Sequence, residues 1–220
     1  GLVFAGLGGH GCVGSMVYPD SSPYHNHGTL TNMDAATDWV WVPELQRWSI
    51  HINTATQSIA STRSGLPLGH SAFTYGGWIA YESNTPGELA GLFIPGGPLC
   101  YSGLRNASFW TRIYNSSSVR VDVAAALATG VWTNCIFRAD LVGENTCKAF
   151  RDGIEVSSKN LTGPAGSYAS ILRFDDLAGS CACKFADWAL WDYALPVPYI
   201  AALADPSNVD LRVGGVPLIL

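Results

Sequence analysis

The sequence predicts an all-β fold in which short strands pack as a sandwich or a barrel. Helix formers are sparse in the 220 residues, whereas Gly, Ser, Thr, Val, Ile and aromatic residues are abundant, and this composition favours strands. From Trp39 onward, short apolar runs alternate with clusters of Gly, Pro, Asn and Ser. Turns at this spacing are typical of sandwiches and barrels.

One domain is expected, because single β-sandwiches reach this length and the chain is long enough to bury a full core. Residues 1–17 are apolar and Gly-rich and are expected to form an arm, residues 18–207 the domain, and residues 208–220 an apolar tail. We expect both ends to contact neighbouring chains, because exposed apolar segments mark interaction surfaces. Pairing of the two ends with each other, along one edge of their own sheet, is the alternative.

The clearest strands form a predicted hairpin in the middle of the chain. One strand is expected over residues 132–140, a turn near Gly143, and a second strand over residues 146–151. The pair Asp152-Gly153 is a favoured hairpin turn and should reverse the chain into residues 154–156.

One short helix is expected near Pro198–Ala204, with a proline at its start. Four residues in strand-like runs flanked by turns are expected to be largely buried: Trp132, Phe137, Trp188 and Leu190.

Charge argues against two classes of partner. Charged residues make up 13% of the chain, about half of the roughly 25% in an ordinary domain, so polar uncharged residues or partner subunits must cover the surface. The net charge of −5 argues against nucleic acid, which is bound mainly by clustered Lys and Arg. Charges and prolines interrupt every apolar run well short of about 18 residues, so no membrane span is expected. The start, GLVFAGLGG, lacks the basic region of a signal peptide, and a signal already removed is the alternative.

The cysteines form no disulfide framework in their spacing, and the chain is long enough to fold without one. They are Cys12, Cys100, Cys135, Cys147, Cys181 and Cys183. We expect buried thiols, with disulfides as the alternative because the number is even.

Four separated segments, in order, resemble the laminin-G-like, concanavalin A-like jelly roll superfamily. They are Asp20-Ser21 with the following SPYHNHGTLTN, then GVWTNCIFRAD, KAFRDGIEV and FADWALWDYALPVPYIAALA, and they span roughly residues 18–205. The resemblance implies a concanavalin A-like jelly roll sandwich of two antiparallel sheets with one short C-terminal helix. It also implies a use in glycan binding, adhesion or assembly, usually without catalysis. WSIHINTATQS replaces the Phe-Asp-Gly stretch common in the family, which argues against a ligand or calcium role for that loop.

The polar cluster at residues 20–27, which ends in PYHNH, raises the question of a metal. It is expected to be a turn, because Asp and Ser side chains bond their own backbone there and Pro fixes the bend. His25 and His27 with one carboxylate are an incomplete ligand set for a transition metal. Calcium is the metal alternative, with Asp20, Asp175 and Asp187 as candidate ligands, although calcium takes six to eight oxygens. No other cofactor is expected.

Catalysis is not expected. Glycoside hydrolases of this sandwich shape need paired carboxylates about 5 to 9 Å apart. No Glu-x-Asp-x-Glu pattern occurs, and the adjacent Asp175 and Asp176 would face opposite ways in a strand. A glucanase-like hydrolase is the remaining enzyme alternative.

Three aromatic residues are candidates for ligand binding: Tyr75, Trp78 and Tyr81 alternate poorly and could be partly exposed, so that a sugar ring could stack on them. Burial in the core is the alternative for each.

These observations predict a non-catalytic structural and interaction module on a virion or cell surface, such as a capsid decoration or fibre component. Its partners would be other subunits of a homo-oligomeric assembly and, in addition, a glycan. The low charge and the apolar ends favour this interpretation. A secreted carbohydrate-binding lectin or adhesin domain is the alternative.

Overall fold

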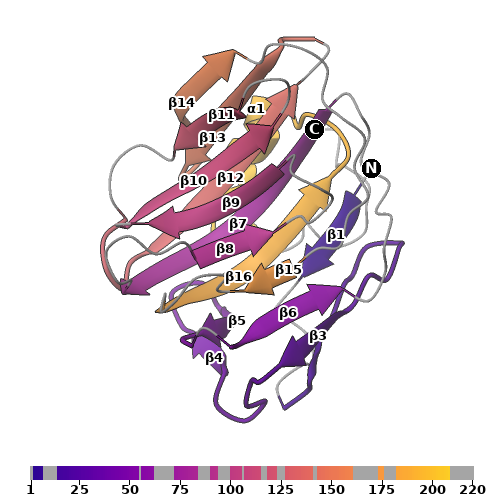
Figure 1. Cartoon of the computed structure of the whole chain (residues 1–220), viewed down its shortest axis with the longest axis vertical. Helices are drawn as coiled ribbons and strands as arrows, with labels where there is room; N and C mark the ends of the chain where they lie inside the picture. The colour runs from indigo at the N-terminus through magenta and orange to yellow at the C-terminus, as the bar shows by residue number, and fades with distance from the viewer. Residues whose placement is uncertain are drawn as a thin grey trace.

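The computed structural model describes residues 2–6, 14–54, 56–61, 72–83, 90–93, 100–105, 107–114, 118–122, 127–140, 143–160, 173–175 and 182–208. They form two antiparallel β-sheets packed face to face, with one short helix against the outside of one sheet (Figure 1). The predicted all-β class, the two antiparallel sheets and the short C-terminal helix are therefore confirmed. In the described part of the chain, no helix is long and apolar enough to span a bilayer.

The first sheet has the strand order β14-β13-β12-β7-β16-β5-β4, and β1 pairs with β16 beside this path. Its strands are β1 (Leu2–Gly6), β4 (Trp39–Val42), β5 (Arg47–Ile52), β7 (Ala72–Ser83), β12 (Trp132–Asp140), β13 (Thr146–Arg151), β14 (Ile154–Asn160) and β16 (Ala182–Trp191).

The second sheet has the strand order β11-β10-β9-β8-β15-β6-β3-β2. Its strands are β2 (Val17–Tyr18), β3 (Gly28–Thr31), β6 (Ser58–Ser61), β8 (Ala90–Phe93), β9 (Cys100–Arg105), β10 (Ser108–Tyr114), β11 (Ser118–Asp122) and β15 (Arg173–Asp175).

The main core lies between the two sheets. It joins Leu30, Ile59 and Phe109 of the second sheet to side chains of the first sheet such as Phe137 and Trp188. Aromatic rings meet edge to face there: the centroids of Phe109 and Trp188 are 5.8 Å apart at an interplanar angle of 79°, a favoured geometry. Three of the four residues predicted to be buried are buried, and Trp132 is only partly so.

Trp132 differs because it lies on the outer face of the first sheet, the face turned away from the second sheet. It packs against a small outer cluster of Val42, Leu45, Trp78 and Ala186. Trp132 is therefore partly exposed because only this small cluster packs against it on the outer face.

Helix α1 (Val197–Leu203) covers another part of the outer face. Ile200 and Leu203 of the helix join Ile136 of β12 and Phe150 of β13 in a second buried cluster. The side-chain amide of Asn134 donates to the carbonyl of Leu203 over 3.2 Å and ties the end of the helix to β12.

Strand β16 changes partner halfway along. Residues 183–185 pair with β5, and residues 188–191 pair with β1. Between them the register with β7 shifts, and Asp187 adopts a left-handed conformation with φ of 52°. Residues 2–6, which the sequence assigned to an arm contacting other chains, are thus a strand of their own sheet. Residues 209–220 of the predicted tail lie outside the described residues.

Three cysteines have described side chains: Cys135, Cys147 and Cys183 are buried and form no disulfide, as expected. Burial, together with the nearby charge of Asp152, raises the pKa of the Cys135 thiol, which keeps it protonated and unreactive. The other three fall outside the part whose side chains are described.

Candidate functional site

The polar cluster at residues 20–27 is a turn organised by one buried carboxylate. Asp20 is 2% exposed. Its Oδ1 accepts hydrogen bonds from the backbone N–H groups of Ala5 and Ser22, both at 2.8 Å. Its Oδ2 accepts from the Ser22 hydroxyl at 2.7 Å and from the Asn26 N–H at 2.6 Å. Asp20 therefore fastens the turn to β1, and both of its oxygens face hydrogen-bond donors.

The two histidines of this turn lie at the surface. His27 Nδ1 accepts a hydrogen bond from the Asp20 N–H at 3.0 Å, and the His25 and His27 ring centroids are 5.9 Å apart. No group of three or more His, Cys, Asp or Glu is placed to hold a metal among the residues that the structure describes.

The other two calcium candidates lie on other strands. The buried carboxylate of Asp187, on β16, pairs with the guanidinium of Arg47, on β5. Asp175 belongs to β15, and its side chain lies outside the described part of the chain. Asp20 and Asp187 therefore each have partners of their own in the fold.

The three aromatic candidates for sugar binding are buried, which corrects the expectation that they are partly exposed. β7 is a central strand covered on both faces. Tyr75 and Tyr81 belong to the core between the sheets, and Trp78 belongs to the outer cluster with Leu45. The Tyr75 hydroxyl also bonds to the Thr111 hydroxyl. No ring face of the three is open to a ligand.

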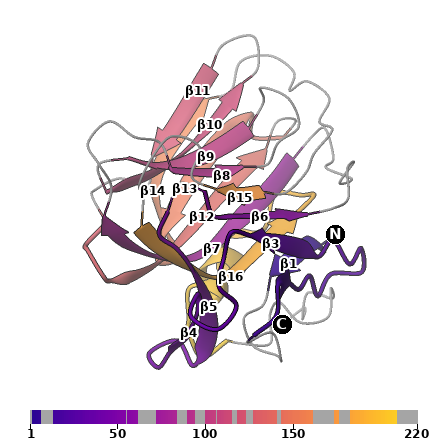
Figure 2. The same ribbon diagram turned by 60° about the horizontal axis from the view of Figure 1, so that its bottom comes forward.

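An exposed aromatic pair lies instead on the β4–β5 hairpin. Trp41 and Trp48 are opposite each other in the register, and their rings meet edge to face with centroids 5.6 Å apart at 67°. Trp41 is 42% exposed, and Trp48 is half-buried against the core. Figure 2 shows that this hairpin forms one end of the molecule. We name these two residues the tip pair.

The hairpin that carries the tip pair is held firmly. In its turn the Leu45 N–H donates to the Val42 carbonyl over 3.2 Å, and the Leu45 side chain is buried in the outer cluster. Arg47 Nε donates to the Leu45 carbonyl over 2.7 Å. The Ser49 hydroxyl donates to the Val40 carbonyl over 3.0 Å. These contacts therefore fix the backbone of the hairpin that carries the two indoles.

A charged cluster crosses three strands on the outer face of the first sheet. Glu82 of β7 bonds to His51 Nε2 of β5 at 2.8 Å through Oε2 and to Lys184 Nζ of β16 at 2.5 Å through Oε1. All three side chains are partly exposed. Burial raises the pKa of Glu82, but the hydrogen bond from Lys184 and the nearby His51 outweigh it and hold the pKa below its usual range.

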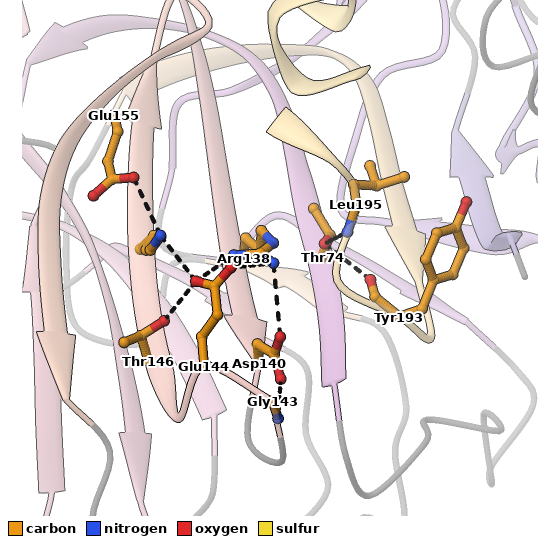
Figure 3. A network of polar contacts seen from close by, with 10 residues as sticks. Thr74, Arg138, Asp140, Gly143, Glu144, Thr146, Glu155, Tyr193 and Leu195 are labelled. Carbon is orange, nitrogen blue, oxygen red and sulfur yellow. Dashed lines mark hydrogen bonds and ion pairs between the residues drawn. The ribbon is translucent and has the colours of Figure 1, made fainter. Parts of the chain in front are cut away.

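A second charged network stabilises the β12–β13 hairpin (Figure 3). Arg138 donates through both terminal nitrogens to the two oxygens of Glu144, each at 3.0 Å. Lys148 lies 2.9 Å from Glu144 and 3.5 Å from Glu155. The hydrogen bonds from Arg138 and then Lys148 lower the pKa of Glu144 to about 2. The network has a structural role, because it fastens the turn at residues 143–145 to two strands.

Comparison with known proteins finds similarity in structure but not in sequence. No protein-family model matches the chain, and no curated protein matches it by sequence. The binding domain of Paraclostridial Mosquitocidal Protein 1 is similar with a TM-score of 0.72 and 14% identity, over 94% of this chain and 52% of that one. The binding domain of Botulinum Neurotoxin DC is similar in its complex with SialylT, with a TM-score of 0.72 and 9% identity, over 93% and 51% of the two chains. Its complex with rat synaptotagmin II has a TM-score of 0.72 at 11% identity over the same shares.

The likeness shows the fold. This chain is a β-sandwich of the kind found in these binding domains, and it spans about half of their length.

The sequence did not point to the tip pair or to the Glu82 cluster. The spacing Trp39-Val40-Trp41 before a turn and Trp48 after it was a usable signal, because alternate residues of a strand share a face. The Glu82 cluster left no such signal, since its three members are far apart in the sequence.

Proposed function

We propose that this chain is a non-catalytic recognition module that binds a carbohydrate at a surface outside the cell. The tip pair carries the proposal. Trp41 offers a large exposed indole at the end of a rigid hairpin, next to Trp48. The apolar C–H face of a sugar ring can be buried against such an indole, and a fixed aromatic loses little conformational entropy on binding.

Two further observations support a binding role. Similar structures are named as binding domains, one in complex with SialylT and one with rat synaptotagmin II. The order of the four resembling segments also supports assignment of the sandwich to the laminin-G-like, concanavalin A-like jelly rolls, which the sequence suggested.

The structural role on a virion or cell surface is the second candidate. The 13% share of charged residues favours it, since a surface with few charges can be covered by other subunits of a homo-oligomer. In that case the tip pair would contact protein, and the native mass of the chain would exceed that of a monomer.

Binding to a glycan array tests the proposal. Trp41→Ala should reduce glycan binding by about tenfold or more without unfolding the chain, because the side chain is 42% exposed. Ile154→Ala is the matched control, since Ile154 is also an apolar, exposed side chain, on β14. Equal binding by the wild type and Trp41→Ala would contradict a glycan role for the tip pair.

A further inference from the structure

The tip pair lies on the face of the first sheet that is turned toward the core. Trp41 and Trp48 are directly opposite in the register, and directly opposed residues of an antiparallel pair share a face. Trp39 and Ile50 are the next residues of β4 and β5 on this face, and both belong to the core between the sheets. The residues of β5 between them, at positions 47, 49 and 51, therefore lie on the outer face.

The described cations are not placed beside the tip pair. Arg47 is buried against Asp187, and Lys184 is opposite His51 and pairs with Glu82, so both cations belong to the outer face. The other lysine and arginine side chains that the structure describes are on β12, β13 and β14, which β7 and β16 separate from β5. A ligand on the tip pair therefore meets no positive charge from this part of the chain.

A carboxylate lies instead in the turn between the two strands that carry the tip pair. Glu44 is exposed, and it follows Trp41 by three residues and precedes Trp48 by four. Since consecutive Cα atoms are about 3.8 Å apart, the Cα atoms of Trp41 and Glu44 are at most about 11 Å apart. The turn is held by Gln46, whose Nε2 and backbone N–H donate to the Pro43 carbonyl over 2.6 Å and 3.3 Å.

We propose that the tip pair and Glu44 together recognise an amino sugar. The sugar ring would pack on the exposed indole of Trp41, and its ammonium group would face the Glu44 carboxylate. The inference rests on the glycan role proposed for the tip pair and names the class of sugar. Two attractions favour the cation, because the face of a Trp ring attracts positive charge and a carboxylate accepts hydrogen bonds from an ammonium group.

The same charges disfavour an acidic sugar. Its carboxylate would lie near Glu44, and like charges placed together oppose binding. The net charge of −5 acts in the same direction, because the field of the whole chain repels anions and attracts cations. A neutral sugar meets neither effect and keeps only its contact with the indole. Affinity should therefore fall from amino sugar to neutral sugar to acidic sugar.

NMR titration with three methyl glycosides that share one ring tests this order. The probes are the methyl glycosides of glucosamine, glucose and glucuronic acid, at pH 6, where the amine is protonated and the acid is ionised. The wild type should bind the glucosaminide about three- to tenfold more tightly than the glucoside, and the glucuronide should bind most weakly.

Substitution of Glu44 separates the charge from the aromatic contact. Glu44→Gln should lower the affinity for the glucosaminide to near that for the glucoside, raise the affinity for the glucuronide, and leave glucoside binding unchanged. Glu44→Asp should keep part of the preference, since it keeps the charge. Glu155→Gln is the matched control, because it removes one negative charge from a 40% exposed glutamate on β14 and should keep the full preference.

The outcomes distinguish this inference from the glycan role itself. Glucoside binding that is lost in Trp41→Ala supports the glycan role whatever the preference for charge. Equal affinity of the wild type for glucosaminide and glucoside would overturn the inference and leave that role standing, as would a preference that survives in Glu44→Gln. If the wild type bound none of the three glycosides, both proposals would be wrong.

Discussion

The guanidinium of Arg47 and the carboxylate of Asp187 form a buried ion pair between residues 140 positions apart in the sequence. Arg47 also donates to the carbonyls of Leu45 and Pro206. One side chain thus joins the β4–β5 hairpin, the irregular part of β16 and the segment after α1. The tip pair depends on this anchor for its position.

Arg47→Met should lower the free energy of unfolding by about 3–5 kcal/mol, because it leaves the Asp187 carboxylate buried without its arginine. Urea denaturation at pH 7 measures the change. Arg47→Met combined with Asp187→Asn should recover part of the loss, since the uncompensated charge is removed. A loss below about 1 kcal/mol in the single variant would show that the pair is not buried as described.

Glu144→Gln should make stability less dependent on pH. The pKa of Glu144 is lowered from 4.5 to about 2. A lowered folded-state pKa contributes stability above the unfolded value and loses it as the pH falls through the folded one. Because the Glu144 side chain is 43% exposed, solvent screening reduces the contribution to about 1 kcal/mol at pH 7.

Urea denaturation at pH 7, 4 and 2 checks this expectation. The difference between wild type and Glu144→Gln should be greatest at pH 7, shrink below about pH 4.5 and vanish near pH 2. A difference that stays constant over this range would contradict the assigned role of the carboxylate.

Asp20→Asn should lower the free energy of unfolding by about 1–3 kcal/mol, because the new amide group would point its own hydrogens at buried donors. Because asparagine keeps only one side-chain oxygen, either the backbone N–H of Ala5 or that of Asn26 would then lose its acceptor. Thermal melting measures the effect. Asp205→Asn is the control, since that carboxylate accepts from Ser207 at an exposed position and its loss should change the melting temperature little.

Gly76→Ala should be among the most damaging single changes in the first sheet. Gly76 has φ of 145°, and an added Cβ would lie 2.1 Å from the Cys135 carbonyl oxygen. The backbone of β7 or β12 would have to move, which we expect to cost more than about 3 kcal/mol. Gly14→Ala is the control: φ is 81° there and nothing lies within 4 Å, so only about 1–2 kcal/mol of backbone strain is expected. Similar melting temperatures for the two variants would contradict this close approach.

Local features were predictable from the sequence. The β12–β13 hairpin, the Asp152-Gly153 turn and the short helix follow from turn chemistry and from short apolar runs, and each lies where it was expected. The alternation of Tyr75, Trp78 and Tyr81 was uninformative because β7 is buried on both faces. In a strand that is buried on both faces, apolar residues do not alternate with polar ones.

Features that depend on non-local pairing were not predictable. His51, Glu82 and Lys184 meet only because β5, β16 and β7 are neighbours in that order. No local sequence pattern indicates which strands become neighbours in a sheet. The same holds for β1, whose apolar residues indicated an exposed arm until their partner strand was known.

The pairing of β1 with β16 sets a limit on when the chain can finish folding during its synthesis. The two strands are Leu2–Gly6 and Ala182–Trp191, so the second half of β16 must leave the ribosome before β1 finds its place. Contacts between segments this far apart form slowly, because a long loop must close first. Until then β1 remains an unpaired apolar segment on the nascent chain, which makes it a natural binding site for chaperones.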